Sequence, residues 1–152
     1  MKKNKVYAGY ICLKPINGII FPSYAQNQMN KKYIIEELNG DFFIATNENM
    51  YADNQIVLNS LIKEKNKLSG IVMLSAFSLP ESYKSRYKIY LDTIKNKKKL
   101  YFIFEKFLLK NKKDIEKIEN YLIYRENFFT KIKKNLNTFE KKNFLNRSWE
   151  YI

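Results

Sequence analysis

An uninterrupted apolar run near the middle of the chain limits the possible folds more than any other feature. It reads Ile-Val-Met-Leu at residues 71–74, between Gly70 and Ser75. A run with no polar position is typical of a strand buried on both faces, as in a parallel sheet that helices cover. Pro80 is suited to open the next helix, because a first helical position needs no N–H donor. We therefore expect a central parallel strand whose carboxyl end borders a ligand site.

Strand-like and helix-like segments alternate on both sides of this run. The predicted strands cover residues 6–12, 41–46, 70–74 and 100–104. Apolar periodicity and capping residues predict helices over residues 24–38, 57–65, 80–94 and 111–122. Because crossovers between parallel strands are right-handed and helices have to cover both faces, this order predicts an α/β fold. We expect a four-stranded, parallel, doubly wound, flavodoxin-like sheet in strand order 2-1-3-4, with a C-terminal helical extension.

The length of the chain and its basic C-terminal part define the domain organisation. A chain of 152 residues is long enough for one well-packed core. We assign residues 1–125 to an α/β domain and residues 126–152 to a basic, amphipathic tail of one or two helices. The default expectation is that the tail packs on the core; the alternatives are that it pairs with another subunit or lies on a membrane surface. No apolar run approaches the roughly 20 residues that span a bilayer, so we expect a cytoplasmic protein.

The scarcity of reactive side chains excludes several function classes. The chain has one cysteine, Cys12, and no histidine. This rules out an internal disulfide and removes the usual metal sites, catalytic triads and imidazole acid–base chemistry. Cys12 ends an apolar strand, so we interpret it as a small core residue. No Gly-rich phosphate loop is present, so we expect neither a common ATP or NAD enzyme nor a cofactor.

The net charge of +13 invites a nucleic-acid interpretation but does not favour it. Nearly all of the positive charge is lysine, with arginine only at positions 86, 125 and 147. Lys, Asn, Ile, Tyr and Phe have AT-rich codons, so a genome of low GC content produces this composition without selection for DNA binding. We therefore interpret most of the lysines as solvated surface charges.

The predicted strand order places a candidate site between the first and third strands, at the carboxyl edge of the sheet. Helices that begin near Ser23 and Pro80 point N–H groups to this edge, which favours a phosphate or carboxylate ligand. The alternative is that these side chains only cap helices, since Ser23 and Gln26 have capping-box spacing. The candidate ligand-binding residues, beside Glu81 and Ser82 of the third loop, are Lys14, Ser23, Gln26, Asn27, Ser78 and Arg86.

Ser75 and Glu105 are the candidate catalytic residues. Each follows a predicted apolar strand, and the two strands are expected to be neighbours. Partial burial there raises the pKa of a carboxyl group toward the range of a general base. The alternative is a solvated Glu105 paired with Lys106 or Lys110. We expect no metal ligands in this cluster.

Three segments, GYICLKPINGIIFPSYAQNQ, LSGIVMLSAFSLPES and LYFIFEKFLLKN, together resemble the sporadic carbohydrate cluster protein family of bacterial surface-polysaccharide genes. The resemblance covers residues 7–125. It implies a cytoplasmic role in lipopolysaccharide or capsule sugar synthesis, without an established reaction. An Arg or Ser commonly follows the first strand in that family, where this chain has Leu13 and Lys14. The motifs that carry the resemblance are Gly9-Tyr10-Ile11, Pro22 with Gln26-Asn27, Ser75 with Leu79-Pro80, and Phe104-Glu105.

The strand order and the Gln26 region are also similar, more distantly, to the catalytic domain of serine recombinases. Those enzymes need a Ser nucleophile just after the first strand and several Arg residues that hold the scissile phosphate. This chain has Cys12, Leu13 and Lys14 at that place, Arg86 as the only arginine of the relevant half, and no recognisable helix-turn-helix domain. We interpret this similarity as a shared fold, which does not imply a shared function.

The favoured hypothesis is a small α/β enzyme or binding protein that handles a phosphorylated or nucleotide-linked sugar at the predicted edge. The first alternative is a non-catalytic partner of a glycosyltransferase or a membrane surface, acting through the tail. The second is a resolvase-like nucleic-acid-binding protein. The residues alone leave open whether the chain catalyses a reaction and whether it forms a homo-oligomer.

Overall fold

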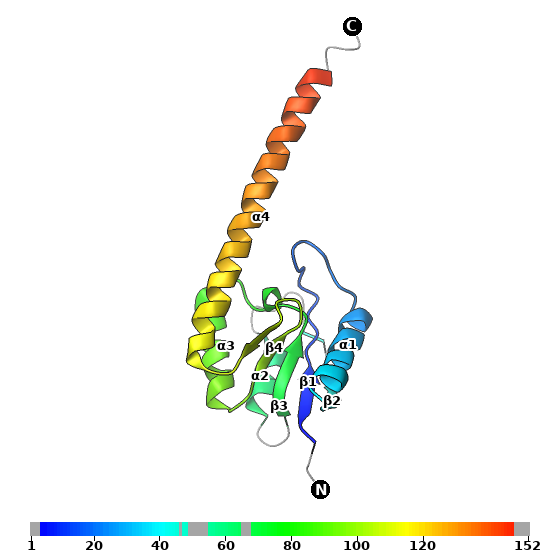
Figure 1. Ribbon diagram of the computed structural model, residues 1–152, viewed down its shortest axis with the longest axis vertical. Coiled ribbons are helices and arrows are strands. Elements are labelled where there is room, and N and C mark those ends of the chain that lie inside the picture. Colours follow the sequence, from blue (N-terminus) through cyan, green and yellow to red (C-terminus); the bar gives the residue numbers. More distant parts are fainter. Residues whose placement is uncertain (1–3, 46, 49–54, 65–67, 148–152) are drawn as a thin grey trace. The chain divides into compact units, whose positions relative to one another are not determined.

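The computed structural model describes residues 4–45, 47–48, 55–64 and 68–147 (Figure 1). Side chains are described up to residue 135 and at residue 137. The chain forms two compact units, Met1–Ile118 and Glu119–Ile152. The domain boundary that the sequence suggests, after residue 125, stays a prediction.

Five strands form one sheet in the order β2-β1-β3-β4-β5. The first four are parallel, which confirms the predicted order 2-1-3-4. A fifth strand, antiparallel to β4, was not predicted. Lys106 adopts a left-handed backbone (φ 49°) in the turn between them, where the sequence has none of the Gly, Asn or Pro residues that usually mark such a turn. The bounds are β1 Val6–Gly9, β2 Asp41–Ile44, β3 Leu68–Met73, β4 Leu100–Phe102 and β5 Phe107–Leu109.

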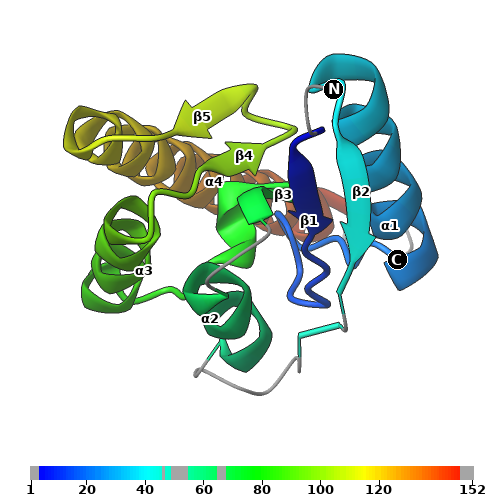
Figure 2. The ribbon, with the colours of Figure 1, turned by 90° about the horizontal axis from the view of Figure 1, so that it is seen from below.

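The helices cover both faces of the sheet, as a doubly wound topology requires. Helices α2 and α3 lie side by side on one face and α1 lies on the other (Figure 2). One buried cluster on the side of α1 consists of Tyr7, Ile34, Val72 and Tyr101. The bounds are α1 Ser23–Lys32, continued by the π-helical turn η1 Tyr33–Glu37, then α2 Ile56–Lys63, the 3₁₀ turn η2 Ala76–Ser78, α3 Tyr83–Lys95 and α4 Lys112–Arg147.

Two predicted helix boundaries differ from the structure. Helix α3 begins at Tyr83 and not at Pro80, because the backbone of Ser82 is extended (φ −68°, ψ 123°) and interrupts any helix that would begin at Pro80. The tail, predicted as one or two helices, belongs to α4, which runs unbroken to Arg147. The central strand is confirmed: Ile71, Val72 and Met73 are fully buried.

Gly70 is a position where the β3–β4 pairing leaves no room for a side chain. A Cβ atom there would lie 2.8 Å from the Lys99 carbonyl oxygen, a backbone atom that accepts the hydrogen bond from the Ile71 N–H. We expect Gly70→Ala to lower the free energy of unfolding by about 1–3 kcal/mol, because the two strands have to move apart. Urea unfolding measures this change, with Ser69→Ala in the same strand as the control. A Gly70→Ala protein as stable as the control would contradict the β3–β4 register.

Candidate functional site

Three loops meet at the carboxyl edge of the parallel strands, where the sequence predicts a site. The loop after β1 contacts the loop after β3 through Lys14, whose Nζ donates a hydrogen bond of 2.9 Å to the Leu79 carbonyl. It also contacts the turn after β4, because the rings of Phe21 and Phe104 lie 5.4 Å apart. The loop after β3 and the turn after β4 are joined by Ser75 and Glu105. We call Lys14, Ser75 and Glu105 the edge cluster.

Ser75 and Glu105 form a hydrogen-bonded pair in the edge cluster. The Ser75 Oγ donates to Glu105 Oε1 at 2.5 Å, and the Ala76 N–H donates to Glu105 Oε2 at 3.3 Å. Ser75 is buried, while Glu105 is half-buried and accessible from solvent. A serine hydroxyl that donates to a carboxylate resembles a nucleophile with its base, but the Ser75 hydroxyl is covered, with 1% of the residue exposed, and the pair also ties the two loops together. The same carboxylate is also suited to accept hydrogen bonds from the hydroxyl groups of a ligand.

Lys14 is the cation of the edge cluster. Its ammonium group lies 3.7 Å from Glu81 Oε1, and its side chain is 26% exposed. The Glu81 carboxylate itself is 89% exposed, so this ion pair is solvated and contributes little to stability. A ligand anion at the edge could therefore replace Glu81 at Lys14 at small cost.

Gln26 lies in the site region, where it ties the loop after β1 to α1. Its Nε2 donates to the carbonyls of Cys12 and Phe21 at 2.8 and 2.7 Å, and its Oε1 accepts from the Cys12 N–H at 3.1 Å. The predicted capping box is wrong, because the N-cap of α1 is Pro22 and has no side-chain hydrogen bond. The Ser23 hydroxyl instead accepts from Asn47 Nδ2 at 2.8 Å. Both hydrogens of the Gln26 amide are therefore donated to backbone carbonyls of this loop. A ligand-binding role of Gln26 stays a prediction.

The other predicted ligand-binding residues lie around this region. Asn27 has a buried Oδ1 atom without a hydrogen-bond partner among the described residues. Ser78 is buried in η2, with its N–H donating to the Ser75 carbonyl at 3.1 Å. Arg86 is 8% exposed and donates from Nη1 to the carbonyls of Pro80 and Glu81 at 3.0 and 2.5 Å. Arg86 therefore holds the loop that carries Glu81 against the start of α3.

A buried polar cluster beside the edge was not predicted. Glu48, 2% exposed, accepts hydrogen bonds from the N–H groups of Val57 and Leu58 and thereby caps α2. The Tyr10 hydroxyl donates to Gln55 Oε1 at 2.5 Å and lies 3.3 Å from Glu48 Oε2. Glu48 is eight residues away from the first residue of the helix that it caps, so no local capping pattern reveals it.

Burial raises the pKa values of Tyr10 and Cys12 in this region. The pKa of Cys12 is raised chiefly by desolvation, which disfavours the reactive thiolate. Cys12 is 3% exposed, which confirms its interpretation as a core residue. The pKa of Tyr10 is also raised by desolvation, with further contributions from Cys12 and Glu48.

The raised pKa of Tyr10 predicts a loss of stability at alkaline pH. The phenol ionises near its ordinary pKa of about 10 in the unfolded chain but stays protonated in the folded chain. The stabilisation is thus complete below about pH 10, and the free energy of unfolding falls by about 1.4 kcal/mol per pH unit above it. We expect Tyr10→Phe to be less stable at neutral pH and to show a flatter decline between about pH 10 and pH 12. Urea unfolding across this range checks it, and parallel declines in both proteins would contradict it.

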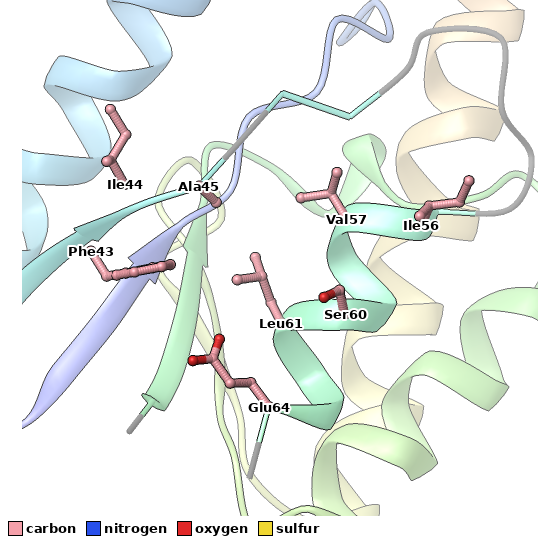
Figure 3. Close-up of a pocket in the computed structure, with 8 residues that line it drawn as sticks. All are labelled: Phe43, Ile44, Ala45, Ile56, Val57, Ser60, Leu61 and Glu64. Atoms are coloured by element: carbon pink, nitrogen blue, oxygen red, sulfur yellow. The ribbon is translucent and has the colours of Figure 1, made fainter. Parts of the chain in front are cut away.

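A separate hollow of about 440 Å³ lies between the end of β2 and helix α2 (Figure 3). Its wall is mostly apolar, and the Phe43 ring points toward Leu61 across it (Figure 3). The Glu64 carboxylate lies at the far end of α2. None of the predicted site residues lines it. The residues that line it are Phe43, Ile44, Ala45, Ile56, Val57, Ser60, Leu61 and Glu64.

Metal-binding and membrane-spanning features are absent from the part of the chain that the structure describes. Among the side chains that the structure describes, no three of His, Cys, Asp or Glu gather closely enough to hold a metal ion. Over residues 4–45, 47–48, 55–64 and 68–147, no helix combines the length and apolarity needed to cross a membrane.

The mostly parallel five-stranded sheet in the order 2-1-3-4-5 and the long C-terminal helix define an α/β fold of the resolvase catalytic-domain type. The chain is similar to the crystal structure of the N-terminal catalytic domain of TP901-1 integrase, with a TM-score of 0.55 and 14% sequence identity. The match covers 91% of this chain and 98% of that domain. This confirms the predicted fold-level similarity to serine recombinases, and at this identity it shows the fold alone. No protein-family model matches the chain, and no curated protein is similar to it in sequence.

Proposed function

We propose that this chain is a cytoplasmic protein of bacterial surface-carbohydrate synthesis that binds a phosphorylated or nucleotide-linked sugar at the edge cluster. The observation that carries the proposal is the pairing of Ser75 with the accessible carboxylate of Glu105, at the same edge as the cation Lys14. Sugars present hydroxyl groups that donate to carboxylates, and their phosphates pair with ammonium groups. The edge cluster offers one group for each part of such a ligand.

The location of the edge cluster supports the same proposal. Ligands of doubly wound proteins bind outside the carboxyl ends of the strands, beside the point where the strand order reverses. In this sheet that point lies between β1 and β3, and Lys14 and Ser75 follow these two strands. The resemblance of residues 7–125 to the sporadic carbohydrate cluster protein family adds the substrate class. If the bound sugar is modified, Glu105 is the group placed to accept a proton from the Ser75 hydroxyl or from a sugar hydroxyl.

A second candidate function is nucleic-acid binding, favoured by the likeness to an integrase catalytic domain and by the net charge of +13. The residues after β1 weigh against the recombinase reaction, because Cys12, Leu13 and Lys14 stand where that chemistry needs a serine. If this chain binds nucleic acid without that reaction, its lysines would contact the backbone phosphates, and such binding is independent of nucleotide sequence.

Thermal unfolding with a ligand panel separates the two functions. The panel contains nucleotide sugars, sugar phosphates, free nucleotides and a short DNA duplex, each at two salt concentrations. A ligand at a concentration of about 100 times its Kd adds roughly 2.7 kcal/mol to the free energy of unfolding. We expect a salt-tolerant rise in Tm with one class of sugar phosphate or nucleotide sugar. A rise with DNA alone, lost at high salt, would contradict the sugar proposal.

A further inference from the structure

We propose that the C-terminal unit, Glu119–Ile152, docks on an anionic lipid surface through an aromatic stripe on α4. The stripe consists of Tyr121, Tyr124, Phe128, Phe129 and Ile132. Apart from the adjacent Phe128 and Phe129, these residues recur three or four positions apart, so they share one face of the helix. Tyr124 is 68% exposed and Phe128 is 45% exposed, which is unusual for large apolar side chains that neighbour one another.

Three neighbouring rings of the stripe, those of Tyr124, Phe128 and Phe129, lie against one another. Tyr124 and Phe128 are stacked with centroids 6.5 Å apart, and Phe128 meets Phe129 edge-on at 6.0 Å. The Arg125 guanidinium lies 4.8 Å from the centre of the Phe129 ring. Aromatic rings with a polar or cationic neighbour suit the headgroup region of a bilayer, where one side of the group is apolar and the other is hydrated.

Lysines border the stripe on both sides. Lys131 follows Phe128 by three positions and Lys133 follows Phe129 by four, so each lies along one edge of the stripe, and both are exposed. Long cationic side chains in this position lay their methylene stems on apolar surface and reach lipid phosphates with the ammonium group. The opposite face carries the polar, exposed Asn127 and Thr130, together with Ile123, which is 52% exposed. This arrangement of an aromatic face with lysine borders fits an anionic lipid surface.

A second copy of the chain fits the same face less well. Glu126 is the one acidic residue between positions 120 and 137, so two stripes packed together would bring lysine borders into contact with few carboxylates to pair with them. Helices that pair with each other generally have aliphatic residues in their interface and opposite charges along its two edges. The charge of the helix thus favours lipid phosphate over a second helix.

Co-sedimentation of the full chain with vesicles tests the proposal. We expect binding to vesicles that contain phosphatidylglycerol, weaker binding at high salt, and little binding to pure phosphatidylcholine. The double variant Phe128→Ser/Phe129→Ser and the double variant Lys131→Glu/Lys133→Glu should each bind at least tenfold more weakly. Asn127→Ser and Thr130→Ala, off the stripe, should bind as the wild type does, and circular dichroism confirms that every variant keeps its helix.

Two outcomes would overturn the proposal. One is vesicle binding that is absent, or that is unchanged in both double variants. The other is a concentration-dependent dimer, seen by sedimentation velocity, that the Phe128→Ser/Phe129→Ser change abolishes, because the stripe is then a subunit interface. A protein with Glu105→Gln should bind vesicles normally, so this test is independent of the sugar proposal.

Discussion

Replacement of Gln26 by alanine is expected to lower the free energy of unfolding by about 3–5 kcal/mol. The Gln26 side chain is 1% exposed and makes hydrogen bonds to the N–H and carbonyl of Cys12 and to the carbonyl of Phe21. Its removal leaves the buried N–H and carbonyl of Cys12 and the partly buried carbonyl of Phe21 without this partner, at about 1–3 kcal/mol for each group that water does not reach. Urea unfolding of the purified protein measures the change.

Gln28 provides the matched control for this prediction, because it is exposed on the same helix. Gln28→Ala should change stability by less than about 0.5 kcal/mol. A Gln26→Ala protein as stable as Gln28→Ala would show that the loop after β1 is not held by this amide. If Gln26→Ala kept its stability and lost ligand binding, Gln26 would be a ligand-binding residue and not a structural tether.

Replacement of Glu105 by glutamine should weaken sugar binding about 5- to 15-fold while the fold stays intact. Glutamine has the shape of glutamate and still accepts a hydrogen bond from Ser75, but it lacks the charge that strengthens hydrogen bonds from ligand hydroxyls. A hydrogen bond to a charged group contributes about 1.5–3 kcal/mol and one to a neutral group about 0.5–1.5 kcal/mol, and the difference of about 1–1.5 kcal/mol corresponds to this range of Kd. Isothermal titration with the ligand found by thermal unfolding gives the Kd.

Glu36→Gln serves as the control for Glu105→Gln, because Glu36 is exposed on η1 and pairs only loosely with Lys32, at 3.9 Å. Its Kd should equal that of the wild type. Equal affinities of wild type, Glu36→Gln and Glu105→Gln would remove Glu105 from the site. A large loss of stability in Glu105→Gln would instead assign the Ser75–Glu105 pair a structural role.

The sheet order could be predicted because it depends on short apolar runs and on the handedness of crossovers. The run at residues 71–74 marks the central strand directly, and right-handed connections then leave few arrangements for the other three. Strand β5 was not predicted, because the turn before it contains a lysine in a left-handed conformation and not one of the residues that usually mark a turn. The start of α3 was misplaced because Ser82, two residues after Pro80, has an extended backbone through which a helix cannot continue.

The site was harder to predict than the fold because its hydrogen bonds connect residues far apart in the sequence. The spacing of Ser23 and Gln26 fits a capping box, but Gln26 bonds to Cys12 and Phe21 instead. Glu48 caps a helix that starts beyond the next loop, and no sequence pattern connects the two. The approach of Ser75 to Glu105 was predictable only in part, from the expectation that neighbouring parallel strands end at the same edge.

The most direct test of the sugar proposal is a titration of the ¹⁵N-labelled protein with a nucleotide sugar such as UDP-glucose, followed through the backbone amide signals. The account predicts that the largest changes occur at Lys14, Ala76, Phe77 and Glu105, which lie in or beside the edge cluster. The signals of Phe43 and Leu61 in the separate hollow should stay unchanged. Changes confined to the hollow, or no changes with any sugar phosphate or nucleotide sugar, would contradict a sugar site at the edge cluster.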